Sequence, residues 1–156
     1  NLRDVFHEQL KDIYSAEKQL TEGLPKLVEA ATNDKLKKAF QNHLTITQKQ
    51  LETVRKLLDQ MDVNPGNTKC DAMEGLIEEA SDMAKEDGDA RDAGLICAAQ
   101  KAEHYEIATY GSLHTWAQVL GETQAANTLQ KLLNEEYDAD GELDKIAKGY
   151  LNQKAK

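Results

Sequence analysis

Glutamate and histidine side chains interrupt four otherwise apolar helical stripes, and they are the residues of this sequence best suited to chemistry. Each interruption falls near the middle of its stripe. The residues are Glu17, His43, Glu103, Glu106, Glu136 and Asp140. A carboxylate in an apolar interior is costly unless it is paired or protonated, and neighbouring carboxylates also repel one another. Because no lysine or arginine falls on the same stripes, a cation from outside the chain is expected to balance these charges.

The mixture of carboxylate and imidazole groups indicates which kind of cation would bind. Sites rich in carboxylate are typical of iron and manganese bound inside helical bundles. The sequence therefore predicts a site for one or two iron or manganese ions, held by the six residues above. Glu103 and Glu106 lie three residues apart, so one helix face can present both to one ion. Thr47 and Gln50 share the stripe of His43 and are expected to pack or to support a ligand, with Gln50 as a reserve ligand.

Each of these residues also has an ordinary structural interpretation. Taken singly, Glu17 fits a boundary position whose carboxylate reaches water, and His43 fits a hydrogen-bonded core histidine. Glutamate pairs such as Glu103 and Glu106 are usually solvated helix surface. Their combination on four stripes favours the metal site. The last stripe selects Glu136 over its neighbour Glu135, which is expected to be exposed.

Aromatic and histidine residues near the polar band are weaker candidates. Tyr14 and Tyr110 could donate a hydrogen bond to a ligating carboxylate, but ordinary amphipathic packing is the role expected for them. His104 projects about 100° away from Glu103 on a helix, which predicts a surface or supporting position. His7 and His114 lie outside the band.

The spacing of apolar residues predicts the helices that carry these side chains. A proline at position 25 predicts a kink or local break in the first helix, and Asn33 or Asp34 is expected to cap the second. Asp71 and Glu74 have the spacing of a capping box before a short helix. Long helices are expected over 2–31, 34–61, 89–120 and 123–151, with the short helix over 71–85.

The connections between these helices predict an all-α, ferritin-like four-helix bundle formed by a single domain, residues 1–156. Tight turns make the first pair of long helices antiparallel, and also the second pair. The segment between the two pairs is long enough to cross the length of the bundle and carries the short fifth helix. One such long crossover is typical of ferritin-like folds rather than of up-down-up-down bundles.

The amino-acid composition narrows the range of partners that this protein is expected to bind. The 156 residues include 28 acidic and 19 basic side chains, for a formal net charge of -9. Such a surface would repel nucleic acid and anionic membranes, so neither is an expected partner. The chain has no transmembrane-length apolar run and no signal-peptide pattern at its start, which favours a soluble, cytoplasmic protein. Cys70 and Cys97 do not form a zinc motif and are expected to be packing residues.

Three runs of this sequence resemble the YciF/YciE family of bacterial stress proteins, which are ferritin-like domains. They are Asp12–Leu20, Met73–Ala80 and Ala99–Ala108, and the most specific piece is Glu-His-Tyr-Glu at 103–106. The resemblance implies a cytoplasmic bacterial protein, induced by stress and dimeric, with a di-metal centre and no firmly assigned reaction. It implies that Glu17, Glu103, Glu106 and Glu136 are metal ligands, with His43 as a further candidate.

The second long helix departs from that family pattern. Relatives read His-Leu-Glu-Glu-Thr, whereas this chain has threonine at position 45 and isoleucine at position 46. Loss of these acids weakens or removes one metal subsite, so a single-metal or metal-free protein stays open. We therefore weigh a metal-binding stress protein with oxidase, ferroxidase or peroxide-consuming activity against a metal-free, self-associating structural module. Whether the chain is an enzyme is left open at this point.

Overall fold

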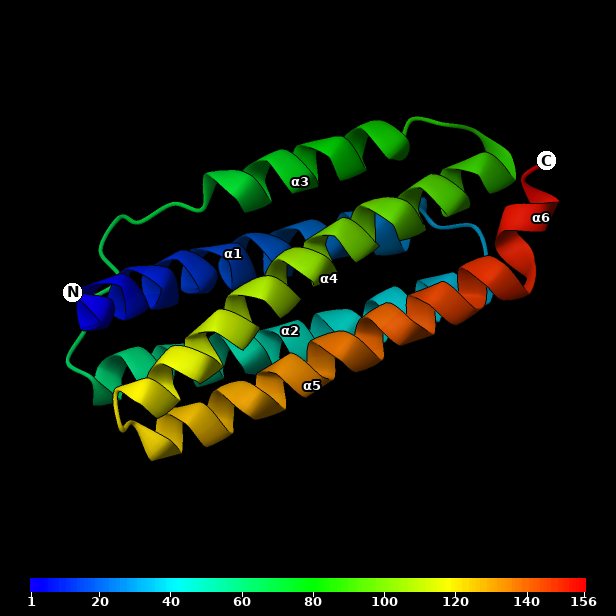
Figure 1. The fold of residues 1–156 in the computed structure, drawn as a ribbon. Helices are drawn as coiled ribbons and strands as arrows, with labels where there is room; N and C mark the ends of the chain where they lie inside the picture. The colour runs from blue at the N-terminus through cyan, green and yellow to red at the C-terminus, as the bar shows by residue number, and fades with distance from the viewer.

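Four long helices and one shorter helix lie side by side along a common axis in the computed structural model, which describes residues 1–156 (Figure 1). The chain contains no strand, and a short π-helical turn ends the last long helix. The elements are α1 (Leu2–Ala30), α2 (Asp34–Gln60), α3 (Asp71–Met83), α4 (Gly88–Val119), α5 (Thr123–Ile146), η1 (Ala147–Leu151) and α6 (Asn152–Lys154). This architecture confirms the all-α fold class expected from the sequence.

The long crossover sets the topology of the bundle. Helices α1 and α2 form one antiparallel pair, and α4 and α5 form the other (Figure 1). The crossover runs the length of the bundle, so α2 and α4 point the same way, as in ferritin-like folds. Within it, α3 packs on the outside against α1 and α4. The opposite side of the bundle, where α2 meets α5, has no such cover (Figure 1).

Local sequence explains where the helices begin. The side chain of Asn33 caps α2 by accepting a hydrogen bond from the backbone N–H of Leu36 at 3.1 Å. The capping box expected at Asp71 is wrong, because Cys70 is the N-cap of α3 and its sulfur accepts from the Met73 N–H. Tertiary contacts fix Cys70 in this role: its backbone N–H donates to Ser15 Oγ at 2.9 Å, and its carbonyl accepts from Gln19 at 3.0 Å.

Helix α1 continues through Pro25, so a local break at this position is wrong, while a kink stays a prediction. Proline removes one backbone donor and crowds the preceding turn, which costs about 3 kcal/mol in an isolated helix. The flanking side chains of Leu24 and Leu27 are both buried. Burial of such side chains contributes a stabilisation of similar size, about 1.5–3 kcal/mol each, and holds the helix together across the proline.

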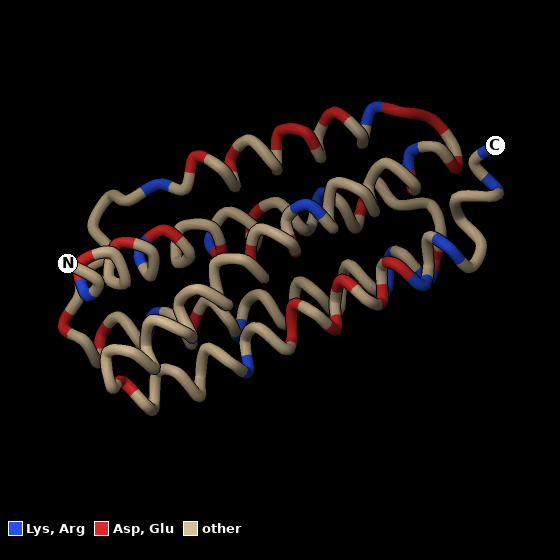
Figure 2. The backbone as a smooth tube through the Cα atoms, in the orientation of Figure 1, with Lys and Arg blue, Asp and Glu red and all other residues tan.

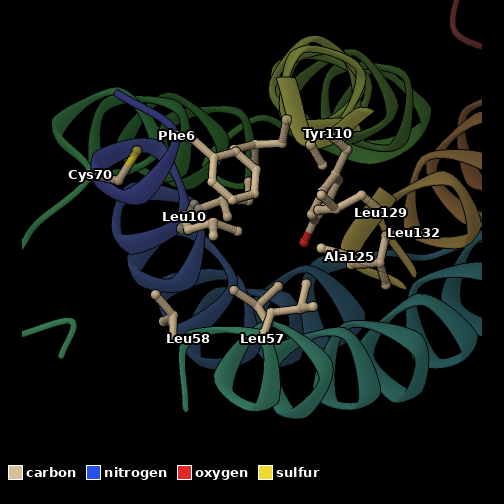
Figure 3. Packing of buried hydrophobic residues seen from close by; sticks show 14 of the residues in the cluster. Phe6, Leu10, Leu57, Leu58, Cys70, Tyr110, Ala125, Leu129 and Leu132 are labelled. Carbon is tan, nitrogen blue, oxygen red and sulfur yellow. The ribbon is translucent and has the colours of Figure 1, made fainter. Parts of the chain in front are cut away.

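The hydrophobic core consists of two separate clusters along the bundle axis. The larger includes Phe6, Leu10 and Leu129 at the end where α4 turns into α5 (Figure 3). The smaller includes Phe40 and Ile96 at the opposite end. On α2 and α5 the buried polar residues lie between these two clusters in the sequence, whereas the buried glutamates of α1 and α4 interrupt the larger cluster. The polar band predicted from the stripes is therefore buried in the middle of the bundle.

A buried carboxylate at the start of α4 joins the two helical pairs. Asp92 is 0% exposed and accepts hydrogen bonds from the Thr32 N–H at 2.8 Å, the Thr32 hydroxyl at 2.7 Å and the Asn33 N–H at 2.8 Å. These three donors belong to the turn between α1 and α2. Asp92 thus ties that turn to α4, a role that no sequence pattern indicates.

Candidate metal centre

Three helices bring one imidazole and three carboxylates together in the polar band. His43 comes from α2, Glu103 and Glu106 from α4, and Glu136 from α5; one ligand atom from each lies within 4.8 Å of the others. The three glutamates are 0% exposed and His43 is 7% exposed. We call these four residues the central cluster. All four were proposed as ligands from the sequence, and metal ligation by them stays a prediction.

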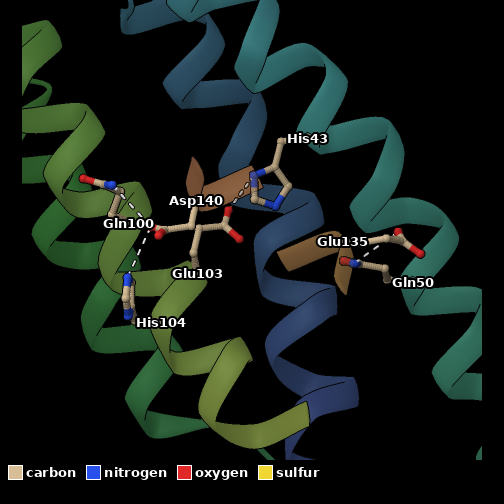
Figure 4. A network of polar contacts seen from close by, with 7 residues as sticks. All are labelled: His43, Gln50, Gln100, Glu103, His104, Glu135 and Asp140. Carbon is tan, nitrogen blue, oxygen red and sulfur yellow. Dashed lines mark hydrogen bonds and ion pairs between the residues drawn. The ribbon is translucent and has the colours of Figure 1, made fainter. Parts of the chain in front are cut away.

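The polar atoms of the central cluster have almost no hydrogen-bond partners. Both carboxylate oxygens of all three glutamates lack a hydrogen bond, and so does Nε2 of His43. Glu103 Oε1 lies only 2.7 Å from His43 Nδ1, a contact visible in Figure 4, yet this oxygen forms no hydrogen bond. Buried polar groups in folded proteins are nearly always satisfied. These groups instead converge on a common region, which fits the donor set of a divalent cation.

Glu17 lies beside the central cluster without being one of its four members. It is 0% exposed, and its Oε1 accepts a hydrogen bond from the Tyr110 hydroxyl at 2.5 Å. Its Oε2 has no partner. Figure 3 shows the Tyr110 hydroxyl pointing into the bundle. Tyr110 therefore takes the donor role considered for it, and it fixes the position of one carboxylate oxygen of Glu17.

Asp140 is not brought into the central cluster. Its side chain is 22% exposed, and Oδ1 lies 3.2 Å from Gln100 Nε2 and 3.3 Å from His104 Nε2 (Figure 4). Helix α5 places it one turn beyond Glu136, where these α4 side chains offer it partners. His104 itself is exposed, in keeping with the surface position expected for it.

The remaining polar residues of α2 lie deep in the bundle. Thr47 and Gln50 are 0% and 1% exposed, and the Thr47 hydroxyl and Gln50 Oε1 lack partners. Gln50 Nε2 donates to Glu135 at 3.4 Å (Figure 4). Glu135 is half-buried, so the exposed position expected for it is wrong. The reason is this contact between α2 and α5, which draws its carboxylate inward.

Burial dominates the electrostatics of the site. It raises the pKa of Glu17 to about 8, with the neighbouring Glu106 carboxyl and the Tyr110 hydrogen bond opposing the effect and the negative charge of Glu136 adding to it. The pKa values of Glu103 and Glu106 are also raised well above the ordinary value, first by burial and then by neighbouring carboxylates. Burial lowers the pKa of His43. A cation in the site would reverse this preference for protonated acids, because it stabilises their ionised form.

A second polar contact, away from the centre, escaped sequence reasoning. The Tyr105 hydroxyl donates to Asp12 of α1 and lies 3.0 Å from the sulfur of Cys70. Burial raises the pKa of Tyr105 above its usual range, as does the contact with Asp12. This contact joins α1, α4 and the N-terminus of α3. A half-buried tyrosine on a helix gives no signal that distinguishes such a role from packing.

Comparison with known proteins settles the family. The model of a domain of unknown function, DUF892, matches residues 1–156. The chain belongs to the DUF892 family. The curated relative YciF of Escherichia coli (strain K12) is 46% identical to this chain over an alignment of 157 positions. The alignment covers 99% of this chain and 95% of YciF. These matches confirm the resemblance to the YciF family that the three sequence runs indicated.

Three solved structures share the fold of this chain. In the crystal structure of the stress protein YciF of E. coli, the chain is 45% identical in sequence to this one. The TM-score is 0.93, and the match covers 97% of this chain and 98% of that one. YcfI of Rhodopseudomonas palustris, described as a candidate structural protein, is 40% identical, with a TM-score of 0.87 over 92% and 93% of the two chains. A Xanthomonas campestris protein at 19% identity, with a TM-score of 0.77 and 99% of each chain covered, shows the same fold.

None of the helices of this DUF892 protein combines the length and hydrophobicity that a membrane span requires.

Proposed function

We propose that this DUF892 protein is a bacterial stress-response protein that binds iron or manganese inside its helical bundle. One observation carries the proposal: a buried imidazole and three buried carboxylates offer ligand atoms within 4.8 Å of one another, and the carboxylates have no hydrogen-bond partners. No lysine or arginine belongs to this group. A divalent cation is the partner that such a donor set fits.

The residues of the buried polar band would take different roles in metal binding. His43, Glu103, Glu106 and Glu136 hold one ion. Glu17, whose free oxygen lies in the same buried band, is the ligand that a second ion would recruit. Asp140 contributes negative charge from the edge, since its own oxygen is engaged with Gln100 and His104.

Bound iron or manganese would supply electron exchange with dioxygen or peroxide, so an oxidase, ferroxidase or peroxide-consuming reaction is the chemistry we propose. The chain provides the surroundings for that chemistry. Burial keeps the His43 imidazole neutral and therefore available as a ligand. Tyr110 holds the Glu17 carboxylate in place. The two apolar clusters exclude water from both ends of the band.

Metal analysis tests this proposal directly. Protein purified without chelator should contain about one iron or manganese ion per chain. A ligand present at 100 times its dissociation constant stabilises a protein by about 2.7 kcal/mol. For a chain of this length, chelation should therefore lower the melting temperature by roughly 5–10 °C. Absence of metal together with an unchanged melting temperature would overturn the proposal.

A metal-free structural module is the second candidate, and two observations favour it. The relative YcfI is described as a candidate structural protein. In addition, α2 has an exposed Thr45 and a half-buried Ile46 at positions where the resemblance to the YciF/YciE family implies acids. In this alternative the buried glutamates keep their protons, as the raised pKa values favour.

The same oligomeric state and the same cellular location are compatible with both candidate functions. We propose a homodimer in the bacterial cytoplasm. Four large apolar side chains are exposed on the isolated chain and are available for such an interface: Val5, Val119, Tyr137 and Tyr150. Light scattering coupled to size-exclusion chromatography should give twice the chain mass of 17.4 kDa, and the mass of a single chain would contradict the dimer.

A further inference from the structure

A cleft opens between α2 and α5, on the side of the bundle that α3 does not cover. Its volume is about 130 Å³. It lies next to the central cluster, because His43 is one of its lining residues. A cation bound in the cluster must have entered from solvent, and this cleft is a candidate route.

His43 is the polar group that connects the cleft to the cluster. It is more than nine-tenths buried, and its Nε2 has no hydrogen-bond partner. Its other ring nitrogen lies 2.7 Å from Glu103 Oε1. The imidazole therefore touches both the cleft and the carboxylates behind it, and it has an unused nitrogen lone pair or N–H in a buried place.

Three carboxylates of α5 line the same cleft: Glu135, Asp138 and Glu142. Figure 2 shows acidic residues recurring along the second half of this helix. Their spacing of three and four residues puts them on one face of the helix. Asp138 and Glu142 are exposed and Glu135 is half-buried, so negative charge continues from the surface inward. No lysine or arginine lines the cleft. Lys49 acts on Glu135 from α2, but it is not a lining residue.

The other opening near the cluster has the opposite character. It lies beneath α3, includes His43 and Glu103, and measures only about 20 Å³, with nine of its twelve lining residues hydrophobic. A hydrated divalent cation loses its water ligands at considerable cost in such surroundings. The wider acidic cleft offers oxygen atoms in place of that water.

We propose that divalent cations reach the metal centre through the cleft between α2 and α5, attracted by Glu135, Asp138 and Glu142 and received by His43. The inference rests on the metal binding proposed above and adds its route. Carboxylates lining a cleft raise the local cation concentration and the association rate, and ionic strength weakens this effect.

Binding kinetics of Co²⁺, an air-stable substitute for Fe²⁺, test the route. The full chain is stripped of metal and mixed rapidly with Co²⁺, and absorbance reports association. The variant Asp138→Asn/Glu142→Gln changes two exposed residues. At low ionic strength its association rate should fall roughly three- to tenfold, whereas its final stoichiometry should match the unmodified chain. At high ionic strength the two rates should converge. Glu52→Gln/Glu78→Gln, at two exposed positions elsewhere, is the matched control and should bind at the original rate.

A second variant obstructs the cleft without changing its charge. Asn42 is exposed and lines the opening, so Asn42→Phe should slow Co²⁺ binding at low and high ionic strength alike. Gln41→Phe, at the exposed neighbouring position outside the cleft, should not. Unchanged rates in both cleft variants would overturn the route while leaving metal binding intact. Loss of stoichiometry in Asp138→Asn/Glu142→Gln would also overturn it, because the acids would then be ligands. Failure of the unmodified chain to bind Co²⁺ would reject the centre itself.

Discussion

Glu103 and His43 show how little the chain itself does to satisfy its buried charges. Their nearest atoms are 2.7 Å apart, yet both Glu103 oxygens lack a hydrogen bond. Removing one member of a buried charged group usually destabilises a protein, because the partner is left alone. Here the other neighbours are further carboxyl groups, which ionise when a cation binds, so the effect depends on whether a cation is present.

Glu103→Ala should therefore have different effects on the metal-bound and the metal-free forms of the protein. We expect it to abolish iron or manganese binding and with it the chelator-sensitive part of the melting temperature. In the metal-free form it should cost less stability than an ordinary buried substitution, since it removes a buried carboxyl group whose two oxygens have no hydrogen-bond partner. Metal analysis and thermal melts measure both effects. The exposed Glu78→Ala serves as control, and full metal content in Glu103→Ala would contradict the assigned role.

Tyr110→Phe tests the single hydrogen bond that Glu17 receives. The substitution leaves a buried carboxyl with no partner at either oxygen, which should cost about 1–3 kcal/mol in the free energy of unfolding. Chemical denaturation measures that cost. The exposed Tyr137→Phe should leave stability nearly unchanged. An equally stable Tyr110→Phe would mean that the contact with Glu17 contributes nothing.

Helix periodicity located most of the buried polar residues, and its failures have identifiable causes. Glu136 rather than Glu135 follows the apolar stripe of α5, and it is the one that the structure buries completely. Asp140 lies four residues later, about 40° further around the helix. That rotation is enough to bring it to Gln100 and His104 instead of the centre.

Features that depend on contacts between distant segments could not be predicted. Cys70 replaces Asp71 at the start of α3 because Ser15 and Gln19 of α1 bind its backbone. Asp92 accepts hydrogen bonds from backbone N–H groups that lie 60 and 59 residues earlier in the sequence. Nothing in the residues around it distinguishes it from a solvated acid in the first turns of a helix.

Asp92→Ala should reveal how much that carboxylate stabilises the junction of the two helical pairs. It leaves the backbone donors of Thr32 and Asn33 without their partner, so we expect a loss of about 3 kcal/mol and a melting temperature lower by roughly 6–12 °C. Differential scanning calorimetry measures the change. The exposed Glu86→Ala, near the same end of α4, should melt like the unmodified protein. A melting temperature matching that control would show that the junction does not depend on Asp92.

At the scale of the whole molecule, the raised pKa values link stability to pH. In the unfolded chain these carboxyls ionise near the ordinary value of 4.5, whereas the folded chain keeps the Glu17 proton up to about pH 8. The metal-free folded state therefore holds more protons between these values. Each proton so retained lowers the free energy of unfolding by about 1.4 kcal/mol per pH unit as the pH rises.

The metal-free protein should accordingly be most stable below about pH 4.5 to 5, as far as these groups are concerned, and lose stability as the pH rises to 8. Stabilisation by added Mn²⁺ should show the opposite trend, because the ion binds ionised carboxylates. Urea denaturation with and without Mn²⁺ at several pH values provides the measurement. A metal-free stability that increases with pH over this range would contradict the proposed protonation of the buried glutamates.

The division of the apolar core into two clusters affects how the molecule opens. Long helices ordinarily fray at their termini, where contacts are fewest. In this bundle both ends are filled with packed hydrophobic side chains, while the middle holds buried carboxyl groups that lack hydrogen-bond partners. Without a cation, the weakest cohesion is at mid-length, so transient opening should start there and spread outward, and an ion at the waist would make the two halves behave as one cooperative body.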